Sequence, residues 1–110
     1  MAINSALILS TDTTLLNVPA GKTYAITTVL VCNYAPTTDI SNDSSLNLHI
    51  IKGSGGVKSN TNKVLNAVAM PAQETFTFSV ERIILEEGDR LVLNSPDPDK
   101  LSATVSYLEV

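Results

Sequence analysis

Apolar and polar residues alternate along much of the chain, and a period of two is the pattern expected of β-strands. The clearest case is the stretch 75–80, in which Phe76 and Phe78 alternate with Thr75 and Thr77. A strand of this kind buries one face and leaves the other in water. The same alternation predicts further strands at residues 46–50, 91–93 and 104–107, and residues 65–69 form a weaker run.

The stretch 24–32 is the longest of these runs, and both of its faces are apolar. Strict alternation divides it into two sets, Tyr24, Ile26, Thr28, Leu30 and Cys32 on one face and Ala25, Thr27, Val29 and Val31 on the other. Strands that are covered on both sides read as nearly continuous apolar runs. We therefore expect a central strand here.

Turn residues separate the apolar runs. Pro19-Ala20-Gly21-Lys22 precedes the stretch 24–32, and Pro71-Ala72-Gln73-Glu74 precedes the Phe76 strand, so the repeated phrase suggests corresponding strands in two packed sheets. Gly88-Asp89 suits a tight connection, because glycine accepts a positive φ. Residues 80–87 are the best candidate for a single helical turn. The polar loops 35–45 and 53–62 are expected to be exposed and mobile.

Taken together, these elements predict an all-β fold. No stretch of twelve residues carries a helical stripe, and about eight short strands follow one another at intervals of roughly ten residues. We expect a single antiparallel β-sandwich of jelly-roll type that occupies residues 1–110. Residues 1–12 form either an N-terminal arm for a partner or the first strand of the domain's own sheet, through Ile3, Ala6, Leu7, Ile8 and Leu9.

The composition supports an ordered domain and argues against two classes of partner. Of 110 residues, 12 are Thr, 11 Ser and 9 Asn, while 44% are hydrophobic and 16% charged, a balance that is atypical of disordered chains and helical bundles. The net charge is −4 and the seven basic residues are scattered, so we expect no nucleic-acid partner. No apolar run approaches the roughly 20 residues that span a bilayer, so we expect no membrane partner. The N-terminus has no basic n-region, which predicts synthesis in a host cytoplasm without secretion.

Candidate catalytic residues are few. Cys32 is the one cysteine, which excludes an intrachain disulfide, and its place inside a strand predicts a buried and inert thiol. His49 is the one histidine, and its alternation with Leu48 and Ile50 predicts an exposed position on a polar strand face. No G-x-S-x-G signature is present. A small hydrolase or isomerase would depend on His49, and we expect a protein that is not an enzyme and has no catalytic residues.

Candidate metal and phosphate sites are equally weak. Glu86-Glu87-Gly88-Asp89 gathers three carboxylates, which we interpret as a solvated turn. Asp97-Pro98-Asp99 offers oxygen ligands for calcium, but its spacing matches no EF-hand loop. Gly53-Ser54-Gly55-Gly56 lacks the Gly-Lys-Ser/Thr ending of a phosphate-binding loop. We therefore expect no metal site and no cofactor.

Three motifs in order carry a resemblance to a known group. They are Val18-Pro19-Ala20-Gly21-Lys22-Thr23 leading into a strand that ends at Cys32-Asn33, then Met70-Pro71-Ala72-Gln73-Glu74-Thr75, and then Leu85-Glu86-Glu87-Gly88-Asp89. In this order the chain resembles the small β-sandwich virion proteins of tailed bacteriophages over most of residues 15–110. The sequence departs from that pattern at Gln73, where glycine is common, so that turn is the least secure of the three.

The resemblance implies a structural role in a virus particle. It predicts a non-enzymatic virion protein that decorates or cements the capsid, or forms another accessory component, by self-association and docking on capsid, neck or tail proteins. The alternatives are a component of the tail, neck or fibres, and a carbohydrate-binding module for host attachment that would use Tyr34 and the loop 35–45. The resemblance implies no catalytic residue, and it places the protein in the virion as a homo-oligomer.

Overall fold

The computed structural model describes residues 2–53, 56–96 and 100–110, and within them the side chains of residues 79–82 are not described. Eight strands and one short 3-10 turn form in the described residues. Their bounds are β1 (Ala2–Leu7), β2 (Thr13–Asn17), β3 (Tyr24–Asn33), η1 (Ile40–Asn42), β4 (Ser44–Ile51), β5 (Lys63–Met70), β6 (Thr75–Leu85), β7 (Arg90–Asn94) and β8 (Leu101–Glu109).

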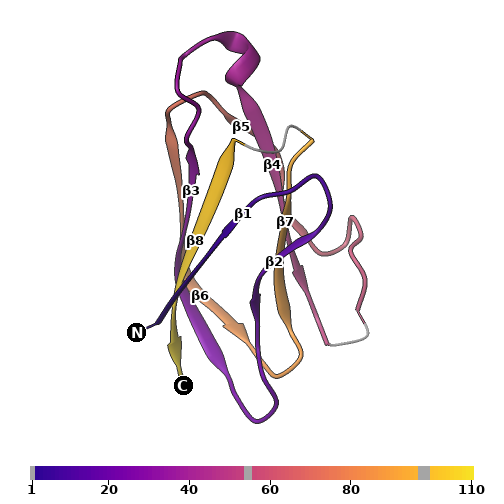
Figure 1. Cartoon of the computed structure of the whole chain (residues 1–110). Coiled ribbons are helices and arrows are strands. Elements are labelled where there is room, and N and C mark those ends of the chain that lie inside the picture. The colour runs from indigo at the N-terminus through magenta and orange to yellow at the C-terminus, as the bar shows by residue number, and fades with distance from the viewer. Residues whose placement is uncertain (1, 54–55, 97–99) are drawn as a thin grey trace.

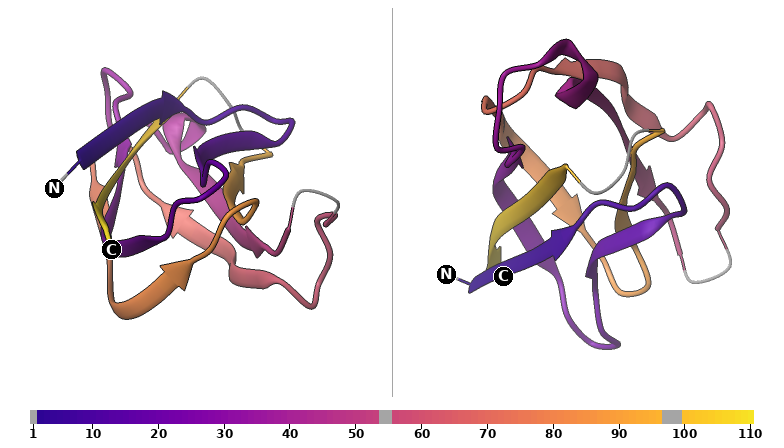
Figure 2. Two further views of the ribbon diagram at one scale, coloured as in Figure 1. Left: turned by 90° about the horizontal axis from the view of Figure 1, so that it is seen from below. Right: turned by 45° about the horizontal axis from the view of Figure 1, so that its top comes forward.

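The strands form two four-stranded antiparallel sheets that face each other (Figures 1 and 2). Sheet A has the order β1-β8-β3-β6, and sheet B has the order β2-β7-β4-β5. The pairs β1–β8, β2–β7, β3–β6 and β4–β5 are those of one long hairpin that has been rolled up across two sheets. This connectivity is the jelly roll, and it confirms the predicted all-β sandwich.

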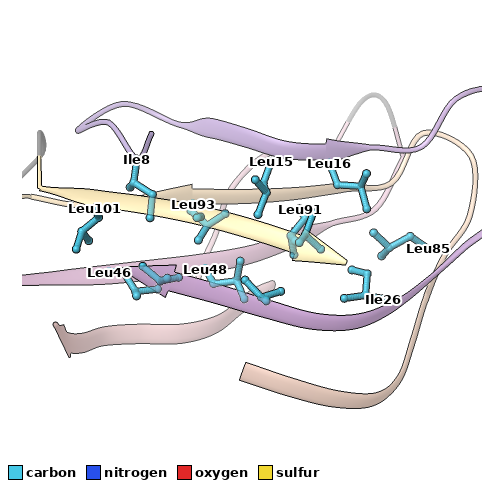
Figure 3. Close-up of a cluster of buried hydrophobic side chains, with 14 of the residues drawn as sticks. Ile8, Leu15, Leu16, Ile26, Leu46, Leu48, Leu85, Leu91, Leu93 and Leu101 are labelled. Carbon is cyan, nitrogen blue, oxygen red and sulfur yellow. The ribbon is translucent and has the colours of Figure 1, made fainter. Parts of the chain in front are cut away.

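An apolar layer fills the space between the sheets. Leu46 and Leu48 of β4 and Leu91 and Leu93 of β7 are fully buried, together with Ile8, Leu15, Leu16, Ile26, Val29, Val31, Leu85, Leu101, Ala103 and Val105 (Figure 3). Each large aliphatic side chain buried in this way stabilises the fold by about 1.5–3 kcal/mol. Phe76 and Phe78 are partly buried against the same layer, as the alternation in the stretch 75–80 predicts.

The strict alternation predicted for the stretch 24–32 is wrong beyond Ile26, because β3 contains a bulge. The register with both neighbouring strands shifts between Ile26 and Thr28. The extra residue moves the inward positions from Ile26 to Val29 and Val31, and it turns Leu30 toward solvent. The strand is central, between β8 and β6, but Leu30 on its outer face is 40% exposed, so this face is not covered as predicted.

The two Pro-Ala phrases form matching turns. The amide of Lys22 donates to the carbonyl oxygen of Pro19 at 3.2 Å, and the amide of Glu74 donates to that of Pro71 at the same distance. The third residue of each turn has positive φ, +78° at Gly21 and +66° at Gln73, so glutamine takes the conformation that favours glycine. The strands that follow, β3 and β6, are antiparallel neighbours in sheet A, so the prediction of two different sheets is wrong.

The helical turn predicted for residues 80–87 is also wrong. Strand β6 extends to Leu85, with a shift in its register with β3 between Ser79 and Ile83. The chain then passes to sheet B through a turn in which the amide of Asp89 donates to the carbonyl oxygen of Glu86 at 3.0 Å. Gly88 at φ +84° makes this turn possible. Ile83 and Leu85 pack inward and require an extended backbone with a period of two, which overrides the weak local helical preference.

One non-glycine residue of β5 also lies in the left-handed region. Ala67 has φ +49°, at a point where the β4–β5 register shifts opposite Asn47. A left-handed alanine costs roughly 1–2 kcal/mol, whereas glycine costs about 0.5–1 kcal/mol in conformational entropy. We predict that Ala67→Gly raises the free energy of unfolding by about 0.5–1 kcal/mol in urea titrations.

The matched control is Ala69→Gly, at an exposed alanine in the same strand with an ordinary extended backbone. This variant should lower the free energy of unfolding by about 0.5–1 kcal/mol. Equal destabilisation by both substitutions would contradict the strain at Ala67.

Candidate interaction surface

Cys32 and His49 lie on opposite sides of the sandwich. Val31 points into the core, so Cys32 faces outward from sheet A, where it is half-buried between Thr75 and Ser102. Leu48 points into the core, so His49 faces outward from sheet B. The whole apolar layer separates the two side chains, and they cannot act as a nucleophile and its base. The thiol is less buried than predicted.

The predicted exposure of His49 is wrong, because the β4–β5 loop folds over it. The imidazole is 3% exposed, and its Nδ1 lies 2.8 Å from Oδ1 of Asn62. The amide nitrogen of the same Asn62 donates to the carbonyl oxygen of Val57 at 2.8 Å, which fixes Oδ1 as the acceptor and Nδ1–H as the donor. His49 is therefore a buried structural residue.

Further contacts anchor the described part of this loop to sheet B. Arg90 Nη2 donates to the carbonyl oxygen of Gly56 at 2.6 Å, and Lys58 Nζ forms an ion pair with Asp12 Oδ1 at 2.8 Å. The ammonium of Lys58 lowers the pKa of the Asp12 carboxyl from its ordinary value. These contacts hold 56–62 against its own sheet, so this part of the chain is less free to meet a partner than its composition suggests.

The acidic turn is only partly solvated. Glu86 and Glu87 are exposed, but Asp89 is 5% exposed. Its Oδ1 accepts from the amide of Gly53 at 2.9 Å, and its Oδ2 accepts from the amide of Glu86 at 3.0 Å. Asp89 therefore joins the start of the β4–β5 loop to the β6–β7 turn, which is a structural role.

No group of three or more His, Cys, Asp or Glu side chains comes together as a metal site in the described residues. The candidate calcium ligands Asp97 and Asp99, like Ser54 and Gly55 of the glycine-rich loop, lie outside the described residues. The model also contains no helix, among the residues it describes, that is long and apolar enough to cross a membrane.

A second buried polar residue, Asn33, organises the loop 35–45. Its Nδ2 donates to the carbonyl oxygens of Asn42 and Met70, both at 2.9 Å, and its Oδ1 accepts from the amide of Ala35 at 3.1 Å. Tyr34 next to it is 47% exposed, and it is the aromatic residue that this end of the molecule offers to a ligand. The loop is thus tied at its base, and its exposed residues are mostly polar ones together with Ile40, which is 86% exposed.

The outer face of sheet A carries many hydroxyl groups, and exposed apolar side chains lie among them, including Leu30, Ile84 and Leu108. Paired residues on neighbouring strands share a face, so the register defines rows across this sheet. Two of these rows contain Ser5, Thr104, Leu30 and Thr77, and Leu7, Ser102, Cys32 and Thr75. Hydroxyl groups contact each other within the face, as Ser5 Oγ and Thr104 Oγ1 do at 3.0 Å. The hydroxyl groups keep this part of the surface hydrated without repulsion between like charges.

The free edge of β1, which we call the β1 edge, adjoins this face. In the described residues β1 is hydrogen-bonded as a strand only to β8, while β2 of sheet B lies close to it on the inner side. Ile3 and Leu7 are 65% and 58% exposed, and the strand contains no charge and no proline. Proteins usually protect edge strands with charges, prolines or bulges, because unpaired main-chain groups recruit other strands.

The other three edge strands carry such protection. Strand β2 has five residues and a register shift between Thr14 and Leu16. Strand β5 has two register shifts and a left-handed residue, and β6 has a register shift and includes Glu81 and Arg82 in its sequence. Within the described part of the chain, the β1 edge is therefore the regular and uncharged one. No local sequence signal identifies it, because the edge position of β1 follows from the sheet order.

Asp89 provides a test of the structural interpretation of the acidic turn. Asp89→Ala removes both acceptors, and we predict that it lowers the free energy of unfolding by about 1.5–3 kcal/mol, since hydrogen bonds to a charged group are lost. Glu86→Ala, at an exposed neighbour, should stay within about 0.5 kcal/mol of the original protein. Chemical denaturation of both variants measures the difference. Equal free energies of unfolding would contradict the structural role of Asp89.

Comparisons with known proteins found no matching family model, no matching curated protein and no matching solved structure.

Proposed function

We propose that the protein is a non-enzymatic structural component of a bacteriophage particle, which decorates or cements the capsid by self-association and by docking on other virion proteins. The observation that carries this proposal is the combination of a hydroxyl-rich outer face of sheet A with an unprotected strand edge. A module that works at high local concentration needs a surface that stays hydrated and an edge that can accept a partner.

The fold is compatible with this role but does not imply it. The jelly roll occurs in viral capsid domains, and it also occurs in lectins and in cupins. One fold hosts many functions, and the function of a protein depends on the residues at its surface and sites. In support, the one Cys–His pair of the chain is divided by the core, and the buried acid Asp89 is occupied by two backbone amides.

A component of the neck, tail or fibres would use the same surfaces, and the proposal includes these positions in the particle. A carbohydrate-binding module is the alternative from another class. The exposed Tyr34 beside a polar loop is the observation that favours it, since sugars stack on aromatic rings. Binding on a glycan array that is lost in the Tyr34→Ala variant would support this alternative over a purely structural role.

Quantitative mass spectrometry of purified particles tests the proposal. We predict that particles of the phage encoding this chain contain it in many copies, at a fixed ratio to the major capsid protein. Particles treated with nuclease and purified by density gradient are the appropriate sample, because host proteins that merely adhere are removed. Absence of the protein from such particles would overturn the proposal.

A further inference from the structure

We propose that the β1 edge pairs with the β1 edge of a second copy of this chain, antiparallel about a two-fold axis at Ser5. The pairing joins two copies of sheet A into one continuous sheet. This inference rests on the self-association in the proposed function and names the surface that performs it.

The backbone of β1 is prepared for such pairing. Its register with β8 runs without interruption from Ala2 opposite Tyr107 to Leu7 opposite Ser102. In an antiparallel strand of this regularity, main-chain N–H and C=O groups point alternately toward the neighbour and away from it. The groups that point away form an evenly spaced row at the free edge, and an identical strand running in the opposite direction satisfies them.

The faces of β1 restrict the register of this pair. Ser5 lies on the outer face with Ile3 and Leu7, whereas the side chain of Asn4 reaches β2 on the inner side, where its Nδ2 donates to the carbonyl oxygen of Leu15 at 3.4 Å. Residues directly opposite each other in a sheet lie on the same face. The residue on the axis, which pairs with itself, is therefore Asn4 or Ser5 in the two central registers.

The Ser5 register is the one that buries exposed apolar surface. With Ser5 on the axis, Ile3 lies opposite Leu7 of the second copy, and the two-fold axis repeats this contact. With Asn4 on the axis, Ile3 lies opposite Ser5 and its apolar surface gains no apolar partner. Since Ile3 and Leu7 are the most exposed apolar side chains of β1, the Ser5 register is favoured.

Charge also favours a second copy at this edge. The protein carries a net charge of −4, so two copies repel each other through most of their surfaces. Strand β1 is uncharged, and at the end of the neighbouring β8 the carboxylate of Glu109 is already paired with the ammonium of Lys22. The repulsion is therefore smallest where the main-chain groups are free.

The size of the contact predicts how strong the pairing is. Strand β1 has six residues, and a strand of that length extends for about 20 Å. Such an edge buries less than the roughly 800 Å² per partner of a standard stable interface. The dimer is therefore reversible in dilute solution and becomes populated at the high local concentration of a lattice.

Sedimentation equilibrium of the full chain over a wide concentration range tests the inference. We expect a monomer–dimer equilibrium that is weakened at least tenfold by Ser5→Lys, because this variant places two like charges opposite each other on the axis. The matched control is Thr77→Lys, which puts the same charge at an exposed position on the same face, on the edge strand β6. Equal dimerisation of the two variants, or a monomeric original protein at every concentration, would overturn the inference.

Disulfide trapping tests the register independently of the charge. In a Cys32→Ser background, Ser5→Cys places two thiols on the axis, and Cα atoms opposite each other in antiparallel strands lie about 4.5–5.5 Å apart, within the range for a disulfide. We expect Ser5→Cys to form covalent dimers at least tenfold faster under mild oxidation than Thr77→Cys. Equal rates would overturn the register.

The two proposals fail separately. A chain that is found in particles but shows no β1-dependent dimer overturns this inference alone. A chain that dimerises through β1 but is absent from particles overturns the proposed function alone. Thermal unfolding of the Ser5 and Thr77 variants, followed by circular dichroism, establishes that both are folded when they are compared.

Discussion

The apolar layer between the two sheets is the interaction on which the rest of the structure depends. It forms only when strands that are far apart in the sequence pair, as β1 does with β8 and β2 with β7. The requirement that Leu46, Leu93 and Val105 point inward fixes which face of each strand is buried. The outward positions of sheet A include many serine and threonine residues, together with exposed apolar residues such as Leu30 and Ile84. The hydroxyl groups of sheet A therefore lie on the side of its strands that is opposite the core.

The same connectivity leaves β1 at an edge. In a rolled hairpin the first strand pairs with the last, and among the described residues β1 therefore lies at the edge of its sheet. The register shifts of β2, β5 and β6 protect the other three edges. An uncharged and regular edge offers one place at which a second copy pairs through its main chain. The proposed role in assembly depends on this edge.

Period-two alternation predicted much of the fold, because it translates directly into burial. Leu46 and Leu48, Phe76 and Phe78, and Val105 all face the core as their patterns indicate. The features that alternation missed depend on contacts between distant segments. The bulge in β3 changes the inward face after Ile26, His49 is covered by a loop that Asn62 holds down, and the buried carboxylate of Asp89 caps amides from two connections. Local sequence carries no signal for any of these contacts, since each of them joins residues that are far apart in the chain.

The central claim is that the β1 edge is where copies of this chain meet. Hydrogen–deuterium exchange at low and high protein concentration measures this most directly, since the outward amides of β1 are free in the monomer and bonded in the pair. The account predicts that amides within Ala2–Leu7 become protected as concentration rises, while those of the edge strand β6 do not change. Unchanged exchange in β1, or equal protection at both edges, would contradict it.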